Sequence, residues 1–185
     1  KPVFYAPWQA ENLIKICERD LRKLGVDINS TKNQIRLELE SNTTALRIMG
    51  FYIDLLQYNQ EIERETIFSW RELHSQAGSA DAAQILGGYN YYQKNYELSK
   101  YYSELALERG NYLAYSFLWR LASSPENGLT TANNETIKLA NNFLRKALLT
   151  ANFRHRSIAY HMMAMEMAKR KKYTQSYVYV EKSLL

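Results

Sequence analysis

Turn-forming residues are scarce in this sequence. Its 185 residues include only three prolines and seven glycines, the two residue types that most often interrupt regular structure. A β-sandwich or a β-barrel needs many tight turns, so this scarcity favours an all-α protein with few connections. The hydrophobic fraction of 46% is ordinary for a folded chain and argues against wholesale disorder.

Cysteine and long apolar runs are missing as well. Cys17 is the only cysteine, which excludes an internal disulfide and leaves the redox compartment open. It lies on the apolar side of a helical pattern, so we expect a small buried hydrophobe rather than a nucleophile. No apolar run approaches the roughly 18 residues of a transmembrane helix, and we predict no membrane span.

Motifs for catalysis and metal binding are also lacking. The three histidines, His74, His155 and His161, form no i, i+4 pair of the kind that binds zinc on a helix. No serine lies in a nucleophile elbow, and no glycine-rich loop suits a phosphate or a dinucleotide. We therefore predict a protein without catalytic activity, small-molecule substrate, metal or cofactor.

Positive charge is only slightly in excess. The 24 basic and 19 acidic residues give a formal net charge of +5, a bias that suits an acidic partner without requiring one. Because no DNA- or RNA-binding motif is present, a nucleic-acid-binding helical repeat is only our second alternative. We expect the basic stretch AKRKKY, residues 168–173, to be a solvated hairpin turn.

Two helices are predicted in the N-terminal part. After Pro7, apolar residues recur at helical spacing up to Leu24, and Gly25 would stop this helix. A connector follows, in which Asn29 or Ser30 would cap a short helix near residues 31–40. We assign residues 1–42 to N-terminal helices that pack on the rest of the chain.

The most informative feature of the sequence is an internal repeat. A small residue is followed four positions later by a large apolar one, which places both on one face of a helix. We expect the small residue to admit a neighbouring backbone and the large one to fill the space beside it. The pairs are Ala45 and Met49, Ala82 and Leu86, Ala114 and Leu118, and Ala159 and Met163.

A second helix is predicted after each of these first helices. Each has an aromatic residue three positions after its opening residue, and usually a small residue one turn later. The series are Ile67, Trp70, His74, Gly78; Ser99, Tyr102, Ala106, Gly110; Ala140, Phe143, Ala147, Ala151; and Ser176, Tyr179, Ser183. Gly78 and Gly110 fall where a helix C-terminus favours a left-handed residue.

The connections inside these hairpins differ in length. Ser99 follows Leu86 by thirteen positions, and Ser176 follows Met163 by the same number. The longest connection carries the stretch SSPENGLTTANN, residues 123–134, where we predict a loop because loops tolerate insertions.

Tyrosines gather between residues 86 and 102, where six of seventeen residues are tyrosine. A base-stacking platform, a membrane-interface belt and packing between short helices would each use such rings. We expect packing for Tyr89, Tyr96 and Tyr102, and we place Tyr91 on a different helix stripe.

The quoted residues resemble the tetratricopeptide superfamily, and especially its Sel-one-like branch. The cluster AAQILG resembles the first helix of that motif, and SKYYSELALERGN resembles the second. The resemblance covers about residues 43–185. It implies a right-handed α/α solenoid of about four helix-turn-helix repeats, with a concave face lined by first helices.

Residues on the stripe of Tyr91 would face that concave side. Aromatic and arginine side chains are frequent anchors at protein interfaces. Projected onto the four repeats, the predicted partner-binding residues are Arg47, Phe51, Asp54, Gln84, Gly88, Tyr91, Ser116, Arg120, His161 and Met165.

The resemblance implies a non-catalytic scaffold that binds another protein, as a peptide, a helix or a toxin domain. We expect an adaptor or assembly factor of a bacterial envelope or secretion system. The alternative is an immunity protein that neutralises a bacterial toxin effector, a role also found in this group. The chain begins at Lys1, which favours an exported form in the periplasm or envelope, with the cytoplasm as the alternative.

Overall fold

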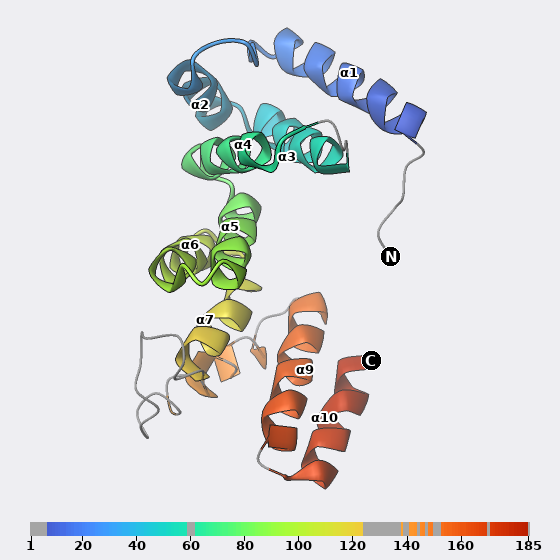
Figure 1. Cartoon of the computed structure of the whole chain (residues 1–185), viewed down its shortest axis with the longest axis vertical. Helices are drawn as coiled ribbons and strands as arrows, with labels where there is room; N and C mark the ends of the chain where they lie inside the picture. The colour runs from blue at the N-terminus through green and yellow to red at the C-terminus, as the bar shows by residue number, and fades with distance from the viewer. Residues whose placement is uncertain are drawn as a thin grey trace. The chain divides into compact units, whose positions relative to one another are not determined.

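The regular structure of the chain is α-helical. The structure, a computed structural model, describes residues 7–58, 62–123, 138, 141–143, 145–146, 148–149, 153–169 and 171–184. All regular elements in these ranges are α-helices (Figure 1), which confirms the predicted all-α class. The chain forms two compact units, Lys1–Ala83 and Gln84–Leu185.

The first unit contains four helices around one core. They are α1 (Pro7–Lys23), α2 (Lys32–Ser41), α3 (Thr43–Tyr58) and α4 (Arg64–Gln76). Helix α3 packs against the other three, and α2 also packs against α4. Cys17 is buried in this core, as predicted, and burial raises the pKa of its thiol.

Small residues let α3 and α4 approach each other. Ala45 and Met49 are fully buried in the core of the first unit. At Gly50 an added Cβ would lie 2.9 Å from Cε1 of His74, so the imidazole ring takes the place of a side chain. The predicted small–large pattern thus marks a real helix contact here.

The second unit begins within α5 and continues to α10. Its helices are α5 (Ala80–Tyr92), α6 (Tyr96–Glu108), α7 (Ala114–Ser123), α9 (Phe153–Lys169) and α10 (Tyr173–Leu184). Helix α7 packs against α6 and α9, and α9 packs against α10. No helix in the described part of the chain is long and apolar enough to cross a membrane.

The predicted register is repeated in two hairpins of the second unit. The Ser99 hydroxyl of α6 donates a hydrogen bond of 2.8 Å to the Gly87 carbonyl of α5. The Ser176 hydroxyl of α10 donates the same bond, also of 2.8 Å, to the Ala164 carbonyl of α9. The small residue of each predicted small–large pair is buried, at Ala45, Ala82, Ala114 and Ala159.

Helix ends also follow a common geometry. Gly78 and Gly110 have φ of +106° and +88°, which confirms the left-handed ends predicted there. Gly25, predicted to stop the first helix, has φ of +89° as well. The turns after α5 and α9 use lysine instead, with φ of +63° at Lys94 and +58° at Lys171. These two lysines occupy equivalent positions in their hairpins, a feature that the sequence pattern does not reveal.

Part of the predicted third hairpin lies outside the described residues. This applies to Ala140, Ala147 and Ala151, and to the loop predicted after Ser123. Phe143, its predicted aromatic residue, is half-buried and packs against Tyr115, with the two ring centroids 6.1 Å apart.

Candidate functional site

Helices α5 and α7 bring an arginine and several aromatic rings together in the second unit. The guanidinium carbon of Arg120 lies 5.9 Å from the ring centroid of Tyr91 and 5.6 Å from that of Phe117. Nη1 of Arg120 donates a hydrogen bond of 2.9 Å to the Tyr92 hydroxyl oxygen. These four residues, Tyr91, Tyr92, Phe117 and Arg120, are called the α5–α7 cluster below.

A glycine makes this arrangement possible. Gly88 is buried on α5, and an added Cβ would lie 2.7 Å from Cζ of Phe117. The Phe117 ring therefore occupies the space that a side chain at position 88 would take. Its ring centroid lies 6.2 Å from that of Tyr91. Gly88, predicted as a contact residue, is buried against the Phe117 ring and does not face solvent.

One ring of the cluster is largely exposed to solvent. Tyr92 is 67% exposed, whereas Tyr91, Phe117 and Arg120 are half-buried. Tyr91 is also held by Tyr96, with ring centroids 6.0 Å apart. Cation–π contacts and the hydrogen bond keep the guanidinium in one orientation at the surface, which suits an anchor for a negatively charged or aromatic group.

The three predicted residues of the first unit all lie on α3 and are exposed. They are Arg47, Phe51 and Asp54. Asp54 already accepts a hydrogen bond from Nη2 of Arg71, which is buried in α4. The same nitrogen donates to Oε1 of Gln57 at 3.1 Å. Asp54 thus neutralises a buried charge, while Arg47 and Phe51 remain candidates for contact.

The other predicted residues are spread over three helices of the second unit. Gln84 on α5 and Ser116 on α7 are half-buried, and His161 and Met165 on α9 are exposed. Of the predicted set in this unit, Tyr91 and Arg120 contact each other, and both contact Phe117.

His74 is a buried titratable group between α3 and α4. Its Nε2 donates to the Leu46 carbonyl oxygen at 2.8 Å, and its side chain is nine-tenths or more buried. Burial is the main cause that lowers the pKa of this imidazole, and the nearby charge of Arg71 adds to it. The ring is therefore held neutral, which fits a structural histidine.

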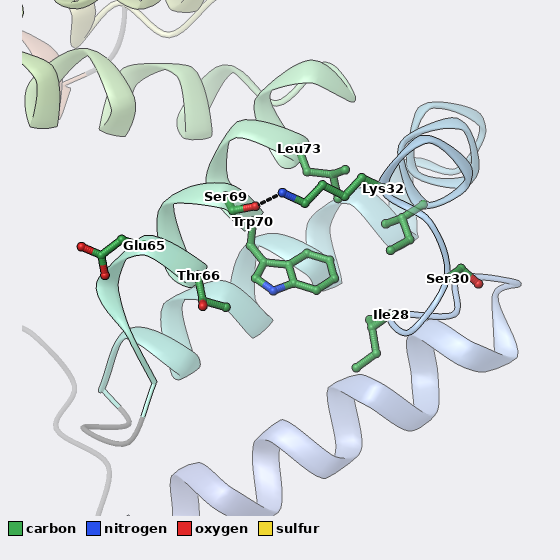
Figure 2. A pocket seen from close by; sticks show the side chains of 9 residues that line it. Ile28, Ser30, Lys32, Glu65, Thr66, Ser69, Trp70 and Leu73 are labelled. Carbon is green, nitrogen blue, oxygen red and sulfur yellow. Dashed lines mark hydrogen bonds between the residues drawn. The ribbon is translucent and has the colours of Figure 1, made fainter.

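A pocket of about 420 Å³ opens in the first unit between α4 and the segment from Ile28 to Ile35. Ile28, Ile35, Trp70 and Leu73 give it an apolar lining. Figure 2 shows the Lys32 side chain reaching over Trp70 to donate a hydrogen bond to Ser69. The volume of this pocket suits a side chain of a partner or a small organic molecule. The Lys32 ammonium would face a negative charge on such a group.

Metal binding has no support in the described ranges, where no three metal-binding side chains (His, Cys, Asp or Glu) come together. The site that the geometry brings forward is the α5–α7 cluster, where Arg120 contacts two aromatic rings and the Tyr92 hydroxyl.

Sequence reasoning missed two members of this cluster. Tyr92 had no assigned role and Phe117 was not considered, because each lies one position away from the predicted stripe. Phe117 precedes Arg120 by three residues, the spacing at which two side chains on a helix meet. That spacing was the available signal.

N-caps before the first helices were also missed. A polar side chain three residues before the buried alanine accepts a hydrogen bond from a backbone N–H near the start of the helix. Asn42 accepts from Ala45 at 3.1 Å, Ser79 from Ala82 at 3.2 Å, and Asn111 from Leu113 at 3.0 Å. A periodic Asn or Ser at this position would have strengthened the repeat assignment.

Comparisons with known proteins add no family. A scan of protein-family models and searches of curated proteins and solved structures find no match to this chain. The resemblance to tetratricopeptide and Sel-one-like repeats therefore depends on the residues of the chain itself.

Proposed function

We propose that this protein is a non-catalytic interaction scaffold that binds a short segment of a partner protein at the α5–α7 cluster. The observation that carries the proposal is Arg120, held over two aromatic rings and hydrogen-bonded to the exposed Tyr92. Tyrosine and arginine dominate the energetics of many protein interfaces. A pre-oriented anchor loses little conformational entropy when a partner binds.

The repeat supports the same proposal. Two hairpins each have the same hydrogen bond between their two helices. Buried small residues also recur at the same register, as in a tetratricopeptide or Sel-one-like array. Such arrays are binding scaffolds in which repeating residues stabilise the fold and non-repeating ones select the partner. By that resemblance the role is an adaptor or assembly factor of a bacterial envelope or secretion system.

The proposal is tested with the full chain and two tyrosine variants. Tyr92→Ala removes the exposed ring of the cluster, and Tyr101→Ala removes an exposed tyrosine of α6 as the matched control. A partner is first captured from the native host by cross-linking, and its affinity for each purified variant is then measured by calorimetry.

We expect Tyr92→Ala to weaken binding about tenfold or more, with Tyr101→Ala close to the wild type and both thermal midpoints unchanged. Equal affinity for all three proteins would contradict the site. A partner that buries a large, folded surface outside the cluster would contradict the adaptor role and favour neutralisation of a toxin.

A further inference from the structure

A second surface of the chain carries large apolar side chains that nothing in the described structure covers. Helix α10 has no buried residue, and among the described helices it packs against α9. Tyr173, Tyr177, Val180 and Leu184 are 66%, 64%, 38% and 81% exposed. Their i, i+4, i+7, i+11 spacing puts them on one stripe of the helix, called the α10 stripe below.

Another stripe of α10 makes the contact with α9. Ser176 donates to the Ala164 carbonyl, and Tyr179 stacks on Tyr160 with ring centroids 6.3 Å apart. Ser183 accepts, through its carbonyl oxygen, a hydrogen bond from the Ser157 hydroxyl. The α10 stripe is therefore separate from the residues of α10 that make these contacts with α9.

The equivalent helix in the preceding described hairpin shows what covers such a flank. Ser99 and Ser176 make the same bond, which aligns α6 with α10 residue by residue. In this alignment Leu107 matches Leu184, and Leu107 packs against Tyr115 of α7. A helix with a small residue, Ala114, and an aromatic one, Tyr115, thus covers on α6 the position that is bare on α10.

Two positions of the α10 stripe carry larger, less polar side chains than the equivalent positions of α6. Tyr177 stands where α6 has the exposed Lys100, and Val180 stands where α6 has the buried Ser103. Contiguous exposed apolar residues of this kind mark interaction sites.

Charge near this stripe selects the partner. Lys171 and Lys172 are exposed at the turn before α10, and the positive end of the helix dipole lies beside them. Glu181 is exposed near the other end of the stripe. We propose that the α10 stripe binds an amphipathic helix of a partner protein, whose acidic end meets Lys171 and Lys172.

The experiment uses the full chain and a designed peptide. An amphipathic peptide of about 20 residues is long enough to form a helix on binding; it carries leucine on one face and glutamates in one terminal half. The matched peptides carry lysines in that half, or the same residues in scrambled order. Binding is measured by fluorescence anisotropy with the wild type and with Tyr177→Ser/Val180→Ser, Lys171→Glu/Lys172→Glu and Tyr92→Ala.

We expect only the acidic amphipathic peptide to bind the wild type, and both α10 double variants to weaken it about tenfold or more. Tyr92→Ala should bind like the wild type, which separates this proposal from the one for the α5–α7 cluster. Circular dichroism checks that each variant remains folded, and the exposed positions make loss of folding an unexpected result.

Several outcomes would overturn the proposal. They are equal binding of the acidic and lysine peptides, unchanged affinity in Tyr177→Ser/Val180→Ser, or no binding at all. Sedimentation that shows a dimer lost in Tyr177→Ser/Val180→Ser would assign the stripe to a second copy of the chain. Binding to vesicles of anionic lipid, lost in the same variant, would assign it to a membrane surface.

Discussion

At the scale of the residue, the contact between Gly50 and His74 shows a polar ring packed where a glycine leaves space. His74 fills the space that Gly50 leaves open and donates to the Leu46 carbonyl. Its Nδ1 is buried and has no hydrogen-bond partner among the described residues. A proton placed on Nδ1 would therefore be buried, near the charge of Arg71.

This environment predicts a loss of stability in mild acid. The pKa of His74 is lowered in the folded protein, while an unfolded histidine titrates near about 6.5. Below that pH the unfolded chain binds a proton that the folded chain refuses, so the free energy of unfolding falls as pH falls. The hydrogen bond to the Leu46 carbonyl opposes the lowering of the pKa, as do Asp54 and Asp81, but burial remains the largest cause.

Urea unfolding at pH 7.5 and 5.5 measures the effect. The wild type should lose more stability between the two pH values than His74→Gln, which keeps a polar side chain but does not titrate. One proton contributes at most about 1.4 kcal/mol per pH unit. If both proteins lose the same amount, the burial of a neutral His74 is not what sets the pH dependence.

At the scale of the element, helix ends show what sequence pattern can and cannot reveal. Gly78 and Gly110 marked left-handed ends in advance, because glycine is the usual residue there. Lys94 and Lys171 have the same backbone conformation but carry no such signal. The ends are still closed by equivalent bonds, from Asn95 N to the Asn90 carbonyl and from Lys172 N to the Met167 carbonyl, each of 2.9 Å.

A glycine at Lys94 should therefore stabilise the protein. The left-handed conformation strains a residue with a Cβ, and its relief outweighs the extra freedom that glycine gives the unfolded chain. We expect Lys94→Gly to raise the free energy of unfolding by about 0.5–1 kcal/mol. Chemical denaturation measures it, with Gln93→Gly as the neighbouring control that should not stabilise. A loss of stability in Lys94→Gly would show that the side chain matters more than its backbone.

The small–large pattern was the part of the hairpins that sequence could predict. Ala45, Ala82, Ala114 and Ala159 are all buried, since helix packing at close range tolerates only small residues at a crossing. The α5–α7 cluster was predictable only in part. Tyr91 and Arg120 followed from the register, but the place of Phe117 depends on the cavity that Gly88 leaves, which is a three-dimensional property.

At the scale of the whole molecule, the solenoid remains a prediction. Periodicity reports which residues of a hairpin are buried, whereas a superhelix depends on small rotations that accumulate from one hairpin to the next. Charge is a property of the whole molecule that the sequence does give. A formal net charge of +5 attracts an acidic partner over a distance, and individual lysines act on it only at contact.

These two effects can be separated by kinetics with the acidic peptide. Lys171→Glu/Lys172→Glu and Lys15→Glu/Lys100→Glu each lower the formal net charge from +5 to +1, because every such change removes two charges. All four lysines are exposed.

We expect both variants to slow association. Added salt should slow association of the wild type too, because it screens the long-range attraction. Only Lys171→Glu/Lys172→Glu should also speed dissociation, since only these lysines are placed to touch the bound helix. Stopped-flow fluorescence resolves both rates. If Lys15→Glu/Lys100→Glu speeds dissociation as much, the lysines beside α10 make no special contact and the attraction is a property of the overall charge alone.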